Sequence, residues 1–150
     1  MTPGVSLRLR APKPEVERDE GDSLGSHLRR RRRELGLRRI DVAQQLGADP
    51  RSLMWWERDE RQPFVSFYPV ILGFLGYEPW PEPETLAEAL LAERRRRGLS
   101  REGAAALVGV DEATLWRWEN AEWKPTQRTA AALDGFLGYA VKERFPREVR

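Results

Sequence analysis

The sequence predicts an all-α fold made of two tandem bundles of four to five helices each. A shift of 62 residues superposes residues 28–77 on residues 90–139 without a gap, and 19 of the 50 pairs are identical. Within each copy, apolar residues recur at helical spacing, glycines separate the runs, and no alternating strand pattern competes. Two long copies indicate two compact domains, because a stacked solenoid needs three or more repeats.

The first helix of each copy is predicted at about residues 24–35 and 84–97. Each ends at a glycine, Gly36 or Gly98, which suits the left-handed cap of a helix C-terminus. The second helix has only about two turns and also ends at a glycine in both copies, Gly47 and Gly109.

The third helix of the first copy begins at Asp49-Pro50. The Asp carboxylate can accept free amide hydrogens of the first turn, and Pro presets φ at the first helical position. Leu53 and Trp56 face inward, so the neighbouring Trp55 is expected to be exposed. A fourth helix follows and ends at Gly76, or at Gly138 in the second copy.

These signals predict a division of the chain into five parts. They are a flexible N-terminal arm (1–23), a first module (24–77), a Pro-rich linker (78–83), a second module (84–139) and a C-terminal tail (140–150).

Composition excludes most enzyme chemistry. The chain has no Cys and one His, His27, which we expect at the surface, so we predict no catalytic residue, metal site or cofactor. The net charge of +2 decides nothing about partners. No apolar run is long enough for a signal peptide or a membrane span, so we predict a cytoplasmic protein without a membrane partner.

A short turn around a glycine joins the second and third helices, which is typical of a helix-turn-helix. Residues 98–102, 107–120 and 125 of the second copy resemble the phage repressor and Cro-like (XRE-type) helix-turn-helix family. The first copy is similar through six sites: Gly36-Leu37, Leu46-Gly47, Asp49, Leu53, Trp56-Glu57 and Pro63. The resemblance covers about residues 24–138.

The resemblance implies that the third helix enters the major groove of DNA, where every base pair presents a distinct pattern, while neighbouring elements hold phosphates. The implied groove-facing residues are Pro50, Arg51 and Trp55 in the first copy and Glu112, Ala113 and Arg117 in the second. The implied phosphate contacts are Arg39, Ser52, Arg58 and Arg61, with Arg101, Thr114, Lys124 and Arg128 as their equivalents. The family pattern also implies ion pairs of Arg32 with Glu57 and of Arg94 with Glu119.

Alternatives stay open at two of these positions. Arg51 suits guanine O6 and N7, or is a solvated surface residue. Trp55 contacts sugar or thymine methyl groups, or anchors a protein interface. Residues 28–62 carry ten basic and six acidic side chains, whereas residues 86–125 carry seven of each, so we expect the first copy to bind DNA more strongly.

We therefore expect a sequence-specific double-stranded DNA-binding protein, a bacterial transcriptional regulator that reads an asymmetric two-part site as a monomeric pseudo-dimer or a weak homodimer. Its further partner would be the transcription machinery or another protein. One alternative is a protein-interaction module that uses Trp55, Trp116 and Trp123. The other is a DNA-targeting component of an antitoxin or recombination system.

Overall fold

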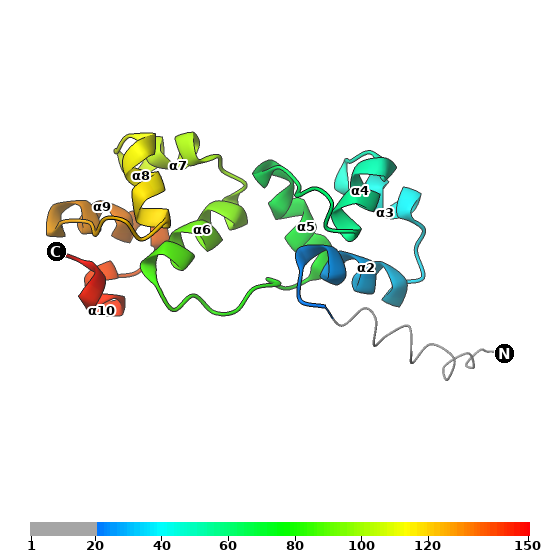
Figure 1. Cartoon of the computed structure of the whole chain (residues 1–150), viewed down its shortest axis with the longest axis horizontal. Coiled ribbons are helices and arrows are strands. Elements are labelled where there is room, and N and C mark those ends of the chain that lie inside the picture. The colour runs from blue at the N-terminus through cyan, green and yellow to red at the C-terminus, as the bar shows by residue number, and fades with distance from the viewer. Residues whose placement is uncertain (1–20) are drawn as a thin grey trace. The chain divides into compact units, whose positions relative to one another are not determined.

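The computed structural model describes residues 21–150 (Figure 1). Every regular element in this range is a helix, which confirms the predicted fold class. Contacts divide the chain into two compact units: one ends at Pro63 and resumes at Val70–Pro79, and the other holds Phe64–Pro69 and Trp80–Arg150. The predicted N-terminal arm lies almost wholly outside the described residues.

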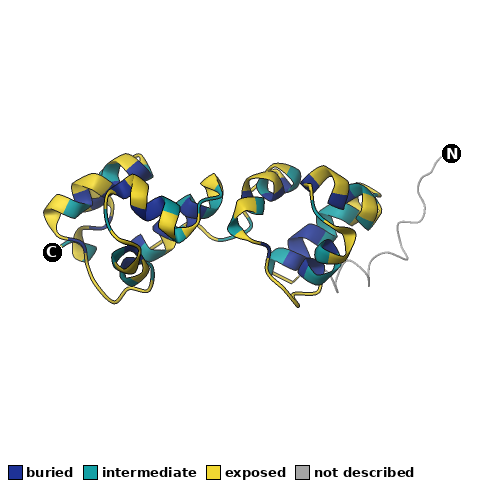
Figure 2. Ribbon diagram, turned by 90° about the horizontal axis from the view of Figure 1, so that it is seen from above, coloured by how far each residue is buried: buried dark blue, intermediate teal, exposed yellow. Residues whose placement is uncertain are grey.

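The first unit contains α2 (Leu24–Glu34), α3 (Arg39–Leu46), α4 (Pro50–Glu57) and most of α5 (Tyr68–Leu75). Figure 2 shows buried stretches alternating with exposed ones along the helices. In α4 the buried residues are Leu53, Trp56 and Glu57, which are spaced as in an amphipathic helix. The core residues of this unit are Leu28, Val42, Ala43, Leu46, Leu53, Trp56, Ile71 and Leu75.

Local caps set the boundaries of α3 and α4. Gly47 has φ +70° and ends α3 in the left-handed conformation. Asp49 is the N-cap of α4, where its Oδ1 accepts a hydrogen bond of 2.7 Å from the amide of Arg51, and Pro50 follows at the first helical position. The start and stop signals seen in the sequence are therefore used as predicted.

The helices α2 and α4 approach each other at Gly25, which is buried. A Cβ atom at this position would lie 2.1 Å from the carbonyl oxygen of Trp56 and 2.7 Å from Oδ1 of Asp59. The start of α2 therefore packs directly on the backbone at the end of α4, with no room for a side chain.

The second unit contains α6 (Leu86–Arg97), α7 (Arg101–Val108), α8 (Glu112–Glu119) and α9 (Gln127–Leu137). Both bounds of α7 and of α8 lie 62 residues after those of α3 and α4, so the sequence shift and the helices agree. Leu90, Leu115 and Leu133 are fully or almost fully buried at the centre of its core.

The last ten residues belong to the core of the second unit, in contrast to the tail expected at 140–150. They form α10 (Val141–Arg144) and the short 3-10 helix η2 (Pro146–Glu148). Val141 and Phe145 are buried with α6 and α9, and the Glu148 carboxylate accepts a hydrogen bond from the amide of Leu86 at 3.1 Å. The fold therefore extends past the expected boundary at 139.

The second unit also includes the segment Phe64–Pro69, which the sequence placed inside the first module. This segment contains the 3-10 helix η1 (Val65–Phe67) and the first turn of α5. Tyr68 packs on Trp80 with ring centroids 6.2 Å apart, and the Arg95 guanidinium lies 5.3 Å from each ring. Aromatic and cation–π contacts therefore hold it against α6.

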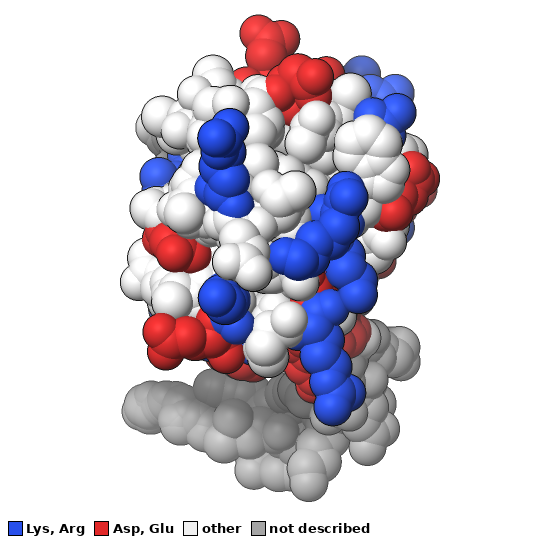
Figure 3. Space-filling model, turned by 90° about the vertical axis from the view of Figure 1, so that its left-hand side faces the viewer, with Lys and Arg blue, Asp and Glu red and all other residues white. Residues whose placement is uncertain are grey.

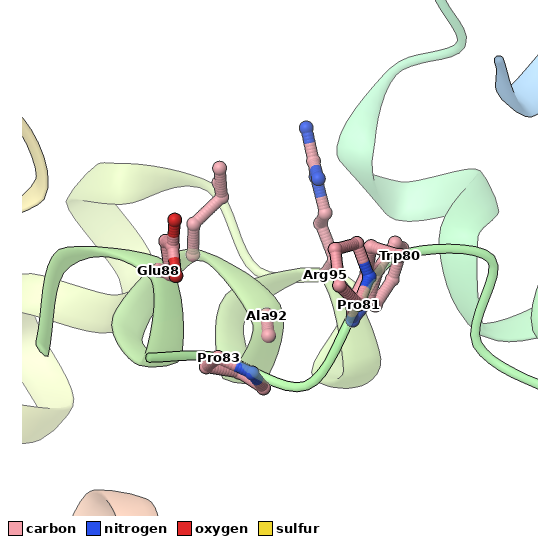
Figure 4. A pocket seen from close by; sticks show the side chains of 7 residues that line it. Trp80, Pro81, Pro83, Glu88, Ala92 and Arg95 are labelled. Carbon is pink, nitrogen blue, oxygen red and sulfur yellow. The ribbon is translucent and has the colours of Figure 1, made fainter. Parts of the chain in front are cut away.

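The Pro-rich linker lies along α6 (Figure 4). Trp80, Pro81 and Pro83 border a hollow of about 210 Å³, whose other side is formed by α6 residues Glu88, Leu91, Ala92 and Arg95. The indole Nε1 of Trp80 is buried without a hydrogen-bond partner. Within residues 21–150, every helix is too short or too polar to span a bilayer.

Candidate nucleic-acid interface

Two helix pairs have the geometry of a helix-turn-helix. In the first unit α3 packs against α4 across a turn that contains Gly47, and in the second unit α7 packs against α8 across a turn that contains Gly109. The second helix of each pair, α4 or α8, has eight residues and an Asp cap at its start. In each unit, therefore, one face of a short helix packs against the preceding helix and another face is exposed to solvent.

The open side of α4 presents the residues expected at the groove. Pro50 and Arg51 are exposed, and Ser52 is half-buried. Arg58 and Arg61, which follow α4, are exposed as well. The side chains predicted to contact bases and phosphates in the first unit therefore reach solvent around one helix.

Trp55 is half-buried rather than fully exposed, because Arg61 covers it. The Arg61 guanidinium carbon lies 3.9 Å from the centre of the Trp55 ring, a cation–π contact. Trp56 occupies the core-facing position, as predicted from the helical spacing. The two predicted site residues Trp55 and Arg61 are therefore one structural pair.

The open side of α8 differs in chemistry. Glu112 and Ala113 are exposed, and the amide of Thr114 donates to the Asp111 cap at 2.7 Å. Arg117 is half-buried, and its guanidinium carbon lies 4.2 Å from the centre of the Trp123 ring. Lys124 and Arg128 are exposed after α8.

The surface of α8 is also hollowed and partly apolar. A hollow of about 360 Å³ is lined by Arg101, Glu112, Ala113, Trp116, Arg117 and Glu122. Trp116 is 40% exposed and Trp123 48% exposed. The end of the second unit drawn in Figure 3 shows Lys and Arg atoms interspersed with Asp and Glu atoms, not a continuous cationic sheet.

Each unit contains a glutamate whose side chain is at most 6% exposed and binds two arginines. Glu57 is 1% exposed; it accepts hydrogen bonds from Arg32 at 2.7 and 3.0 Å and from Nε of Arg39 at 3.0 Å. Glu119 likewise accepts from Arg94 at 2.7 and 3.1 Å and from Arg101 at 3.4 Å. The ion pairs implied by the family pattern are present in both units.

Arg39 and Arg101, predicted as phosphate contacts, therefore already have a carboxylate partner. Their side chains are 40% and 35% exposed, so part of each guanidinium still faces solvent. The five donors of a guanidinium allow one side to bind Glu while the other side meets a second acceptor. Sequence spacing alone did not reveal this second arginine at each glutamate.

Hydrogen bonding lowers the pKa of two aspartates in these motifs. The side-chain and backbone hydrogen bonds from Thr114 lower the pKa of Asp111, and the charge of Arg117 adds to the effect. The side chain of Arg38 donates to the Asp41 carboxylate at 3.0 Å, which lowers the pKa of Asp41 and raises the pKa of Arg38. Both carboxylates sit in the first turn or cap of a helix.

His27 is buried, contrary to the expectation of a surface residue. It is 9% exposed, and its Nδ1 lies 2.7 Å from the hydroxyl oxygen of Tyr77, with Asp22 at 3.3 Å from Nε2. The imidazole thus joins α2 to Tyr77, two residues after the end of α5. Among residues 21–150, no group of three or more metal-ligating side chains could hold a metal ion.

The comparison with protein families agrees with this geometry. Residues 85–144 match the model of a helix-turn-helix domain. The match begins at the N-cap of α6 and ends with α10, so α10 lies inside the matched segment. Comparison with curated proteins and with solved structures gives no match.

Proposed function

We propose that this protein binds double-stranded DNA sequence-specifically as a bacterial transcriptional regulator, through α4 and α8. The match of residues 85–144 to a helix-turn-helix domain carries this proposal, because this motif places its second helix in the major groove. The exposure of Arg51 on α4 supports it, since a planar guanidinium on an open helix can reach guanine O6 and N7.

The two units would read different half-sites. α4 carries Arg51 and Trp55 where α8 carries Ala113 and Arg117, so the two helices present different groups to bases. An asymmetric two-part site follows, unlike the palindrome that a symmetric dimer reads. One chain then acts as a pseudo-dimer.

The phosphate contacts of this proposal are unequal in the two units. The first unit has Ser52 on α4 and Arg58 and Arg61 directly after it. The second unit has Thr114 on α8 and Lys124 and Arg128 after it, together with acidic side chains. We therefore expect the first unit to supply more of the affinity. Each neutralised phosphate adds about 0.9 to the slope of log K against log salt.

The test is a salt titration of binding to random and to selected duplexes. It compares the wild type with Arg51→Ala and Arg117→Ala, and with Arg147→Ala as a control that removes an exposed charge at η2. Arg51→Ala should lower the preference for the selected duplex about tenfold with an unchanged helical circular dichroism spectrum. A variant that keeps the full preference would refute the assigned role of Arg51.

A protein-interaction function is the second candidate, and the surface of α8 favours it. Trp116 of α8 and Trp123 in the loop after it are exposed, and aromatic side chains are typical anchors of protein interfaces. Glu112 and Glu122, which line the hollow on α8, would repel DNA phosphates. This function would be favoured over DNA binding if a protein partner stays bound at high salt while no duplex binds at about 50 mM salt.

A further inference from the structure

The loops that follow α4 and α8 have the same backbone. Asp59 has φ +59° and Ala121, 62 residues later, has φ +57°, which is uncommon for residues other than glycine. The amide of Glu60 donates to the carbonyl oxygen of Trp55 at 2.9 Å, and the amide of Glu122 donates to that of Arg117 at 2.8 Å. Both loops therefore turn back over the last turn of the helix.

This turn brings two positions together in each unit, and the residue types at these positions are exchanged. In the first unit the helix carries Trp55 and the loop carries Arg61, 3.9 Å from ring centre to guanidinium carbon. In the second unit the helix carries Arg117 and the loop carries Trp123, at 4.2 Å. Positions 55 and 117 are equivalent under the 62-residue shift, and so are positions 61 and 123.

We propose that this exchanged Arg–Trp pair determines which chemical group each unit presents to the bases. The proposal rests on the proposed function and names the residues that set its specificity. A stacked partner restricts the rotamers of the helix residue, so an indole is held on α4 and a guanidinium on α8. The Arg117 guanidinium carbon lies over the Trp123 ring, and a guanidinium carries five N–H donors in its own plane, so a stacked arrangement would leave donors for a base edge.

The exchange also moves the base-reading arginine by one helical turn. On α4 the arginine is Arg51, and Trp55 lies four residues later on the same face. On α8 position 113 is Ala, and the arginine is Arg117. One turn is about 5.4 Å, and base pairs are about 3.4 Å apart, so the guanine contact shifts by one to two base pairs between half-sites.

The test exchanges the pair in one unit at a time within the full chain. One double variant is Trp55→Arg with Arg61→Trp, and the other is Arg117→Trp with Trp123→Arg. Proton NMR of the arginine Nε–H reports the stack through its ring-current shift. Selection from a random duplex pool reports the preferred site of each variant.

Each exchange should keep the upfield-shifted arginine signal and change the preferred bases in one half-site only, with about a tenfold loss of affinity for the wild-type site. Arg58→Gln is the matched control, because it removes a charge from the same loop outside the pair. It should weaken binding to all duplexes alike and leave the preferred bases unchanged.

Three results would overturn the proposal. An exchange that loses the shifted signal and still changes the preferred bases as predicted would show that the stack does not determine the group presented. An exchange that keeps the stack and the wild-type site would refute the role in specificity, while the proposed DNA function stands. A wild type that binds no duplex would refute the proposed function and this assignment together, although the NMR signal would still report the stack.

Discussion

Arg32 donates two hydrogen bonds to Glu57, from Nε at 2.7 Å and from Nη2 at 3.0 Å. Its Nη1 also donates to the carbonyl oxygen of Leu37 at 3.3 Å, so the guanidinium is satisfied on three sides. The pair joins α2 to α4 within the first unit. Charge-assisted bidentate pairs are the stronger hydrogen bonds in proteins, and this one fixes the helix that presents Arg51.

Arg32→Met should destabilise the first unit by about 3–5 kcal/mol, because it leaves the Glu57 carboxylate buried without its main partner. Arg39 would remain as a partner of Glu57, which places the loss toward the lower end of that range. Amide hydrogen exchange of α2 and α4 in the full chain measures it. Arg33→Met, at an exposed position of the same helix, is the control and should cost less than about 0.5 kcal/mol.

Gly25→Ala should destabilise the first unit by about 1–3 kcal/mol or more, because the new methyl group would overlap the backbone of Trp56. Gly73→Ala is the matched control on α5, where an added Cβ meets no atom within 4 Å. In a helix interior this change should stabilise by about 0.5–1 kcal/mol. Equal effects of the two substitutions on the urea midpoint would contradict the close approach of α2 and α4.

Local signals explain how much of the fold was predictable from the sequence. Asp49 and Gly47 act on the backbone within three residues, so the bounds of α4 and α3 follow from residue types alone. The packing of Tyr68 on Trp80 depends on tertiary contacts, which periodicity does not encode. Two buried residues around a four-residue helix are too few to produce a periodic pattern, so the folded C-terminal segment was missed.

The sequence predicted where the candidate site lies, but it did not predict the side-chain contacts within it. The family resemblance located the exposed face of α4 and α8, since exposure follows from helical register. The stack of Arg117 on Trp123 depends on the path of a loop whose turn uses Ala121 in a left-handed conformation. Ala rarely adopts this conformation, so the residue type at this position did not predict the turn. The second arginine at Glu57 likewise comes from a different helix.

Phe145→Ala should destabilise the second unit by about 3–5 kcal/mol, because Phe145 is 5% exposed and fills the core beside α9. The amide of Arg150 also donates to the carbonyl oxygen of Pro125 at 2.8 Å, which ties the last residue to the loop before α9. Thermal unfolding of the full chain measures the loss. Arg147→Ala, at an exposed position between these two, should leave the transition unchanged within error. If the C-terminal residues did not contribute to the core, both variants would unfold at the same temperature as the wild type.

The Asp111 cap should make the second unit sensitive to acid. Its pKa is lowered in the folded state from the ordinary value of 3.8, chiefly by the hydrogen bonds from Thr114. A group with a depressed folded pKa contributes stability that is present above the unfolded pKa and is lost as pH falls through the folded pKa. The melting temperature of the second unit should therefore fall as pH drops below about 4.

Asp111→Asn and Asp111→Ser keep a cap acceptor that does not titrate, so both should flatten this part of the profile. Asp111→Ala should lower the melting temperature at neutral pH as well, because the amide of Thr114 then loses its acceptor. An acid profile that is the same in wild type, Asn and Ser variants would show that the cap charge does not stabilise α8.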